Sequence, residues 1–92
     1  MAKLYNKNTA LLEYEGVFRR GKLNGQGTYF NKFGRMIYTG NFKDGSYDGQ
    51  GKLYKKNMCY YIGNFKDGYE QGKGILYHKN GKKKYDGEFV DG

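Results

Sequence analysis

Residues 16–22 carry the spacing of a phosphate-binding P-loop. Gly16, Gly21 and Lys22 stand where that motif places its two glycines and its lysine. In a P-loop, the backbone N–H groups and the ammonium group hold the phosphates of a nucleotide. The motif also requires Ser or Thr at the following position and then a helix, but here Leu23 follows and no helical periodicity is present. The sequence therefore argues against nucleotide binding of this kind.

The single cysteine and the single histidine are the one candidate pair of a thiol nucleophile and an imidazole base. Cys59 and His78 both fall in variable connecting segments with no third group placed to orient the imidazole, so we interpret them as a connector thiol and a surface imidazole. No cluster of His and Cys has the spacing of metal ligands. Several carboxylates directly precede a glycine, where Asp stabilises a turn: Asp44, Asp67 and Asp91. We therefore predict a protein that is not an enzyme and that has no cofactor and no metal.

All these residues lie within a sequence repeat of about 24 residues that reads Tyr-x-Gly-x-Phe-x-x-Gly-x-x-x-Gly-x-Gly. Each copy opens with a tyrosine and has a phenylalanine four residues later; these are Tyr14, Phe18, Tyr38, Phe42, Tyr61, Phe65, Tyr85 and Phe89. A period of this length marks a stacked array in which each unit is too small to bury a core alone. The repeat pattern therefore decides the fold class.

Each copy predicts one β-hairpin. The Tyr, Gly and Phe positions alternate as in a strand, a second alternating run follows, and a glycine-bounded turn such as 43–48 separates them. We predict that Tyr38 lies opposite Leu53, that Phe42 lies opposite Gly49, and that two glycines also face each other. Repeated strand glycines imply a trough without Cβ atoms, in which aromatic rings lie flat.

Successive hairpins predict one all-β domain, an elongated, single-layer, twisted antiparallel sheet of stacked β-hairpins. We divide it into a half unit at 1–13 (second strand only), repeats at 14–37, 38–60 and 61–84, and a half unit at 85–92 (first strand only). Both outer strands should have an unpaired edge. We expect either that the array continues in a longer protein or that these edges pair with another copy.

Composition sets the limits on class. The 92 residues suffice for one small domain, and a net charge of +8 with few aliphatic residues would by itself indicate disorder. However, 11 Tyr and 16 Gly stand in strict register, which indicates a packed sheet. No signal-peptide core, membrane-spanning apolar segment or cysteine pair is found, so we expect a cytoplasmic location, either free or at the periphery of a membrane.

The repeated Tyr, Gly and Phe positions resemble those of the MORN (membrane occupation and recognition nexus) repeat family. Three consecutive copies match its pattern in phase, and with the two half units the likeness covers nearly the whole chain. The resemblance implies an elongated sheet of stacked hairpins, a binding or scaffolding role that often includes homodimerisation, and no catalysis by the repeats. It also implies phospholipid binding through basic residues in some members.

Charge distinguishes the two edges of the predicted sheet. The connectors between hairpins hold most of the lysines, namely Lys7, Lys32, Lys55, Lys56, Lys79, Lys82, Lys83 and Lys84, together with Arg35. Lys7, Lys32, Lys56 and Lys79 follow an aromatic residue at matching positions, which predicts a column with a spacing of roughly 9.5 Å. The turns within hairpins carry five basic and five acidic residues, so that this edge should be close to neutral.

Two functions fit these features. The first is a protein-interaction or scaffolding module that self-associates through its open edge strands or through an aromatic face formed by Tyr14, Phe18, Tyr38, Phe42, Tyr61, Phe65, Tyr85 and Phe89. The alternative is binding of anionic phospholipids, such as phosphoinositides, through the lysine-rich edge. Nucleic acid is disfavoured, because the tyrosines that would stack on bases should be packed in the sheet.

Overall fold

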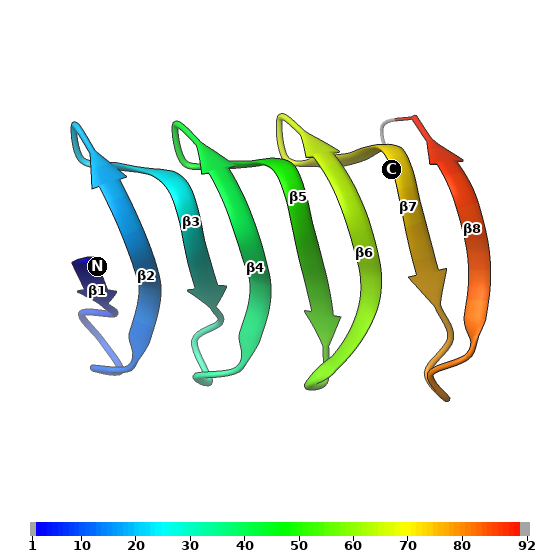
Figure 1. Cartoon of the computed structure of the whole chain (residues 1–92). Coiled ribbons are helices and arrows are strands. Elements are labelled where there is room, and N and C mark those ends of the chain that lie inside the picture. The colour runs from blue at the N-terminus through cyan, green and yellow to red at the C-terminus, as the bar shows by residue number, and fades with distance from the viewer. Residues whose placement is uncertain (1, 91–92) are drawn as a thin grey trace.

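Eight antiparallel strands follow one another along residues 2–90, the part of the chain that the computed structural model describes (Figure 1). They are β1 (Ala2–Tyr5), β2 (Leu12–Arg19), β3 (Lys22–Phe30), β4 (Met36–Lys43), β5 (Ser46–Lys55), β6 (Met58–Lys66), β7 (Tyr69–Tyr77) and β8 (Lys83–Phe89). Each strand pairs with its sequence neighbours in one open sheet measuring 37 × 27 × 18 Å. The predicted all-β sheet of stacked hairpins is confirmed. The turn acid Asp91 and the outermost residues of the predicted half units 1–13 and 85–92 lie outside the described part.

The hairpins β2–β3, β4–β5 and β6–β7 close through two-residue turns. Asp44 and Gly45 both have positive φ angles, 50° and 86°, which is the type I′ geometry that matches the twist of paired strands. Arg20–Gly21 and Asp67–Gly68 repeat this conformation. The predicted turn over 43–48 was therefore too long, because Lys43 and Ser46 are already paired.

The predicted register within a hairpin is correct at one end and wrong at the other. Tyr38 lies opposite Leu53 and the two glycines of the pair Gly40–Gly51 face each other, as expected. A β-bulge between Gly40 and Phe42 then shifts the pairing, so that Phe42 lies opposite Tyr47 and not opposite Gly49. Gly49 has a φ of 90° and pairs with a phenylalanine of the next hairpin.

The core lies on one face of the sheet. Its buried residues are Leu23, Tyr38, Phe42, Leu53, Tyr61 and Phe65. The Tyr38 ring stacks on that of Tyr47 with 3.8 Å between centroids, and its hydroxyl donates to the backbone carbonyl of Asn41 at 2.7 Å. This ring occupies the space over Gly51, where a Cβ would lie 2.5 Å from its Cε1 and Cζ atoms. The glycine trough is therefore confirmed, and it lets a single-layer sheet bury aromatic rings.

Successive hairpins are joined by contacts that recur along the array. The backbone N–H of Gly45, at the tip of β4–β5, donates to the carbonyl of Leu23 at 2.9 Å. The N–H of Gly68 donates to the carbonyl of Tyr47 in the same way, at 3.0 Å. Side-chain amide hydrogen bonds, Gln26 to Asn41 and Gln50 to Asn64, also link neighbouring hairpins. These bonds hold each turn against the preceding hairpin.

The three connectors that follow β3, β5 and β7 adopt two forms. The β3–β4 and β7–β8 connectors are five-residue loops in which a glycine, Gly34 or Gly81, has a positive φ angle. In each loop its N–H donates to a carbonyl three residues earlier at 2.9 Å. The β5–β6 connector is a two-residue turn, with positive φ angles at Lys56 and Asn57. The second repeat, which has Met58 where the others have Gly34 or Gly81, therefore has the tighter connector.

We expect the sheet to lose stability as the pH rises from about 10 to about 12. Burial raises the pKa of Tyr47 to about 12 from its ordinary value of 10.0, with further contributions from neighbouring charges, and it also raises the pKa of Tyr38. In this range the unfolded chain has released phenol protons that the folded chain retains, so a rise in pH favours unfolding. Urea unfolding at pH values between about 9 and about 12 measures the change in the free energy of unfolding.

The matched control for this pH dependence is Tyr47→Phe, which removes one ionisable hydroxyl and keeps the ring. We expect the variant to lose less stability than the original chain over the same interval, because one of the retained protons is gone. An unfolding free energy that stays constant through pH 12 in the original chain would contradict the pH prediction.

Candidate functional site

A groove runs along the connector edge of the sheet, the lower edge in Figure 1, between the ends of β5 and β8. It has a volume of about 570 Å³, and we call it the connector groove. Its lining consists of Lys55, Lys56, Met58, Cys59, Tyr60, Leu76, Tyr77, His78, Lys79 and Lys84. Four of the eight predicted lysines thus come together around a groove with an apolar wall.

The strands explain why apolar and basic groups meet there. β6 and β7 pair directly, and their connector-edge ends supply Tyr60 and Leu76, which both pack on the core. Lys55, at the end of β5, places its ammonium 5.7 Å from the centroid of the Tyr60 ring. An ammonium over an aromatic face is attracted by the ring's negative π surface. The groove therefore combines apolar side chains that pack on the core with lysines around them.

The other predicted lysines lie elsewhere on this edge. Lys7 lies in the β1–β2 connector, and Lys32 lies 5.3 Å from the centroid of the Phe33 ring in the β3–β4 connector. Lys82 closes the β7–β8 loop, and Lys83 forms an ion pair with Asp86 at 3.6 Å. The structure therefore does not bring all eight lysines into one site.

One detail of the predicted basic edge is wrong. Lys55, Lys83 and Lys84 belong to strands and not to connectors, because pairing continues further than the alternating pattern indicated. The spacing of the predicted lysine column stays a prediction, and the connectors that carry its lysines differ in form. Lys32 is the second residue of a five-residue loop, whereas Lys56 is the first residue of a two-residue turn.

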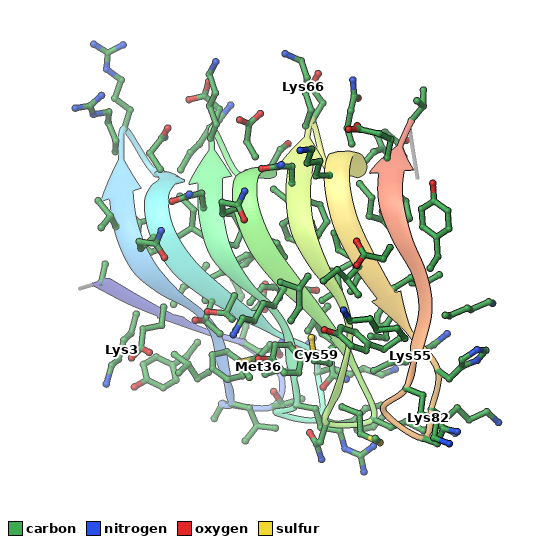
Figure 2. All side chains as sticks on the ribbon, turned by 45° about the vertical axis from the view of Figure 1, so that its right-hand side comes forward. Lys3, Met36, Lys55, Cys59, Lys66 and Lys82 are labelled. Atoms are coloured by element: carbon green, nitrogen blue, oxygen red, sulfur yellow. The ribbon has the colours of Figure 1, made fainter. Side chains whose placement is uncertain are left out.

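Cys59 and His78 both line the connector groove, but no catalytic arrangement follows from their positions. Cys59, labelled in Figure 2, lies within β6 and not in a connector. Its Sγ donates to the carbonyl of Tyr61 at 3.5 Å. Burial raises the pKa of the Cys59 thiol above its ordinary value, so the nucleophilic thiolate is disfavoured. Cys59 therefore contributes to the lining of the groove and not to a catalytic pair.

The predicted aromatic interaction face is wrong for the central repeats. Tyr38, Phe42, Tyr61 and Phe65 are at most 4% exposed, because they pack on one another and over the glycine trough. Tyr14, Phe18 and Phe89 are partly buried, and only Tyr85 is exposed, at 46%. Most of these rings therefore form the core of the sheet. Exposed aromatic side chains occur instead at Tyr5, Phe33 and Tyr69.

A second cleft lies between the turns of hairpins β2–β3 and β4–β5, at the edge that we expected to be close to neutral. Its lining residues are Arg19, Arg20, Lys22, Asn24, Lys43 and Asp44. The net charge of the whole edge does not indicate this cluster, because the basic residues are concentrated in the first hairpin and the acidic residues lie in the later ones. The Arg-Arg pair in the first turn, where later turns have Lys-Asp, was the signal that could have revealed it.

Neither a metal-ligand cluster nor a membrane-spanning helix is found within residues 2–90. That part of the chain contains no group of three or more His, Cys, Asp or Glu side chains arranged to hold a metal ion. It also contains no helix that is long and apolar enough to cross a bilayer.

Comparison with known protein families agrees with this architecture. The family model for the MORN repeat matches three segments, residues 14–32, 38–57 and 61–83, which together make up more than half of the chain. No curated protein matches the whole sequence significantly. MORN repeats are known from modules that interact with proteins or membranes, and they are generally not catalytic. The chain belongs to the MORN repeat family.

Proposed function

We propose that this chain is a non-catalytic protein-binding module and that its connector groove holds an acidic segment of a partner protein. The observation that carries the proposal is the make-up of the groove. Four lysines border an apolar wall formed by Met58, Tyr60 and Leu76, and no carboxylate is present among the described residues that line it. Such a surface fits a peptide segment in which carboxylates alternate with apolar side chains.

Size and charge both support a short segment as the occupant. A volume of about 570 Å³ lies within the range of about 300–1,000 Å³ that is usual for ligand sites. The lysines would steer an acidic segment toward the groove and fix its orientation, while the apolar wall would supply the contact area. Met58, which is 47% exposed, would lose most of this exposure in the complex.

Self-association through the groove is disfavoured by charge. Two copies that met groove to groove would bring Lys55, Lys56, Lys79 and Lys84 of each chain close to those of the other, and like charges repel. The central aromatic rings are buried, so they do not supply a contact surface either. Self-association through the edge strands β1 and β8 stays a prediction.

The lysine-rich edge also favours a second function, binding to anionic phospholipids. Each lysine near an anionic leaflet contributes about 1 kcal/mol. The four lysines of the groove would together contribute about 4 kcal/mol, which corresponds to an affinity of about 1 mM. Lipid binding by one copy would therefore be weak and sensitive to salt.

We expect the double variant Lys55→Gln/Lys79→Gln to bind a short Glu-Leu alternating peptide about 3–10-fold more weakly than the original chain, because exposed charge pairs contribute up to about 1 kcal/mol each. Isothermal titration calorimetry measures the affinity. The matched control is Lys52→Gln/Lys73→Gln, which removes the same charge from strand positions outside the groove. Met58→Ser should also weaken binding, since it removes apolar contact area.

Equal weakening by both double variants would contradict the groove as the site, because it would show that only net charge matters. Liposomes separate the two candidate functions. Binding to acidic liposomes, with no measurable binding of the peptide, would replace the protein-binding proposal by the lipid-binding one. Equal binding to neutral and acidic liposomes would contradict the lipid-binding function.

A further inference from the structure

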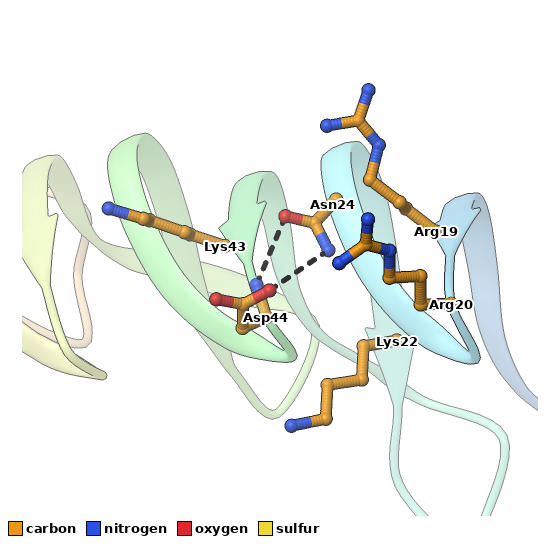
Figure 3. A pocket seen from close by; sticks show the side chains of 6 residues that line it. All are labelled: Arg19, Arg20, Lys22, Asn24, Lys43 and Asp44. Atoms are coloured by element: carbon orange, nitrogen blue, oxygen red, sulfur yellow. Dashed lines mark hydrogen bonds between the residues drawn. The ribbon is translucent and has the colours of Figure 1, made fainter.

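We propose that the turns of hairpins β2–β3 and β4–β5 form a binding site for a small anion that carries two or more phosphate groups. The site is the cleft lined by Arg19, Arg20, Lys22, Asn24, Lys43 and Asp44, which we call the tip cleft; its volume is about 870 Å³ (Figure 3). It lies at the opposite edge of the sheet from the connector groove, so this inference is independent of the proposed function.

The tip cleft has an excess of positive charge, and none of its cationic side chains forms an ion pair within residues 2–90. It contains four cationic side chains and one carboxylate. Among residues 2–90 the ion pairs are Lys3–Glu15 and Lys83–Asp86, and neither lies in the cleft. Four unpaired cations gathered around one opening create a positive potential that attracts polyvalent anions.

Hydrogen bonds between the two hairpins hold the cleft at a fixed width. The Asn24 side chain accepts a hydrogen bond from the backbone N–H of Asp44 at 3.2 Å and donates one to the Asp44 carboxylate at 3.4 Å. The backbone bond from Gly45 to Leu23 adds a third link between the same hairpins. The backbone positions that carry the cations are therefore set before any ligand binds.

The cationic side chains have the chemistry and the reach to hold phosphate. Figure 3 shows Arg20 extending from the first hairpin toward Asp44 and Lys22 extending below Asp44, while Arg19 and Lys43 extend outward from the two turns. A guanidinium group can donate two parallel hydrogen bonds to one phosphate, and a lysine ammonium adds a point charge. Two arginines and two lysines suit an anion with more than one phosphate group.

The repeat itself does not require this cluster. In the equivalent place between hairpins β4–β5 and β6–β7, the six matching positions hold Lys43, Asp44, Ser46, Asp48, Lys66 and Asp67. These carry two basic and three acidic side chains, whereas the tip cleft carries four basic and one acidic. The same backbone arrangement thus supports opposite charge, which gives the chain an internal reference for the site.

That internal reference supplies the test variant. Arg20→Asp/Lys22→Ser installs the residues that the second hairpin has at the same positions, and Asp44 already shows that Asp adopts the positive φ angle that position 20 requires. With pyrophosphate as the probe in calorimetry, we expect the variant to bind at least about tenfold more weakly than the original chain, because it loses two charge-assisted contacts. Lys52→Gln/Lys73→Gln, which lies outside both the tip cleft and the connector groove, should leave pyrophosphate binding unchanged.

Asp44→Asn provides a test in the opposite direction. Asn tolerates a positive φ angle, and the change removes the only negative charge from the cleft, so we expect about threefold tighter pyrophosphate binding. Equal affinity of the original chain and Arg20→Asp/Lys22→Ser would overturn the proposal, as would an Asp44→Asn variant that binds no more tightly.

The phosphate groups could belong to a soluble molecule or to a lipid headgroup, and the experiment distinguishes these sources. A soluble inositol phosphate and vesicles containing the corresponding phosphoinositide are titrated in parallel. Binding of the soluble compound that Arg20→Asp/Lys22→Ser abolishes supports a free ligand, whereas binding confined to the vesicles and lost in the same variant supports a headgroup. Binding of either kind that the variant leaves unchanged overturns the site.

Discussion

Gly51→Ala is expected to destabilise the protein by about 3–5 kcal/mol, because overpacking displaces a ring that has no room to move. A Cβ at this position would lie 2.5 Å from Cε1 and Cζ of Tyr38. That ring is fully buried, stacked on Tyr47 and packed edge-on against Phe42 and Phe65. For 92 residues, the total stability expected is about 5–14 kcal/mol, so this one methyl group removes a large part of it.

Gly27→Ala is the graded control for Gly51→Ala. Its Cβ would lie 3.2 Å from the Phe42 ring and 3.2 Å from the backbone carbonyl oxygen of Glu15, contacts that shifts of a few tenths of an ångström relieve. We expect a change of about 1 kcal/mol or less, because Ala also lowers the entropy of the unfolded chain. Urea unfolding of both variants measures the difference, and similar losses of stability would contradict the role assigned to the trough.

The Tyr38→Leu background tests whether the ring is the cause of the penalty. Without the ring, the alanine methyl group at position 51 has space, so we expect Gly51→Ala to cost about 1 kcal/mol or less there. The double variant should then be more stable than the sum of the single changes predicts. Full additivity would show that the glycine is needed for another reason.

The periodicity was enough to predict the fold, because the repeated glycines mark the positions where two strands must approach each other without side chains. A glycine at 40 and a glycine at 51 face each other, and that pairing alone aligns Tyr38 with Leu53. The bulge after Gly40 was missed, because it places two extra residues of β5 opposite Asn41 without changing the repeat pattern on either side. The pairing of Gly49 with Phe65 in the next hairpin was missed for the same reason.

Candidate sites were harder to predict than the fold because they depend on which side chains meet across hairpins. The lysine-rich edge was predicted from the sequence. The apolar wall of the connector groove depends on the pairing of β6 with β7, which brings Tyr60 and Leu76 to the same edge. The tip cleft was missed because Arg20 and Lys43 come from different repeats, and charges added along a whole edge conceal a local excess. The central aromatic rings, which were predicted to form an interaction face, are buried because they pack over the glycine trough.

Tyr61→Ala is expected to cost about 3–5 kcal/mol, the usual range for removing a buried aromatic ring. The Tyr61 ring is fully buried and packs edge-on against Phe65 and Phe89 with centroids 5.1 and 5.0 Å away. Its hydroxyl donates to the carbonyl of Asn64 at 2.9 Å, so Tyr61→Phe alone should cost about 1 kcal/mol. Thermal and urea unfolding measure both losses.

Tyr85 is the matched comparison, because it holds the same repeat position in β8. It makes the same hydrogen bond, to the carbonyl of Glu88 at 2.8 Å, and the same edge-on contact with Phe89, yet it is 46% exposed. We expect Tyr85→Ala to cost about 1–2 kcal/mol, since much of its ring area is already in water. The difference between the two losses of stability measures what the next strand, β8, adds by covering the Tyr61 ring. The loss in Tyr85→Ala measures what the local contacts of the repeat motif contribute. Equal losses would mean that the motif's local contacts, and not the stacking of hairpins, stabilise each unit.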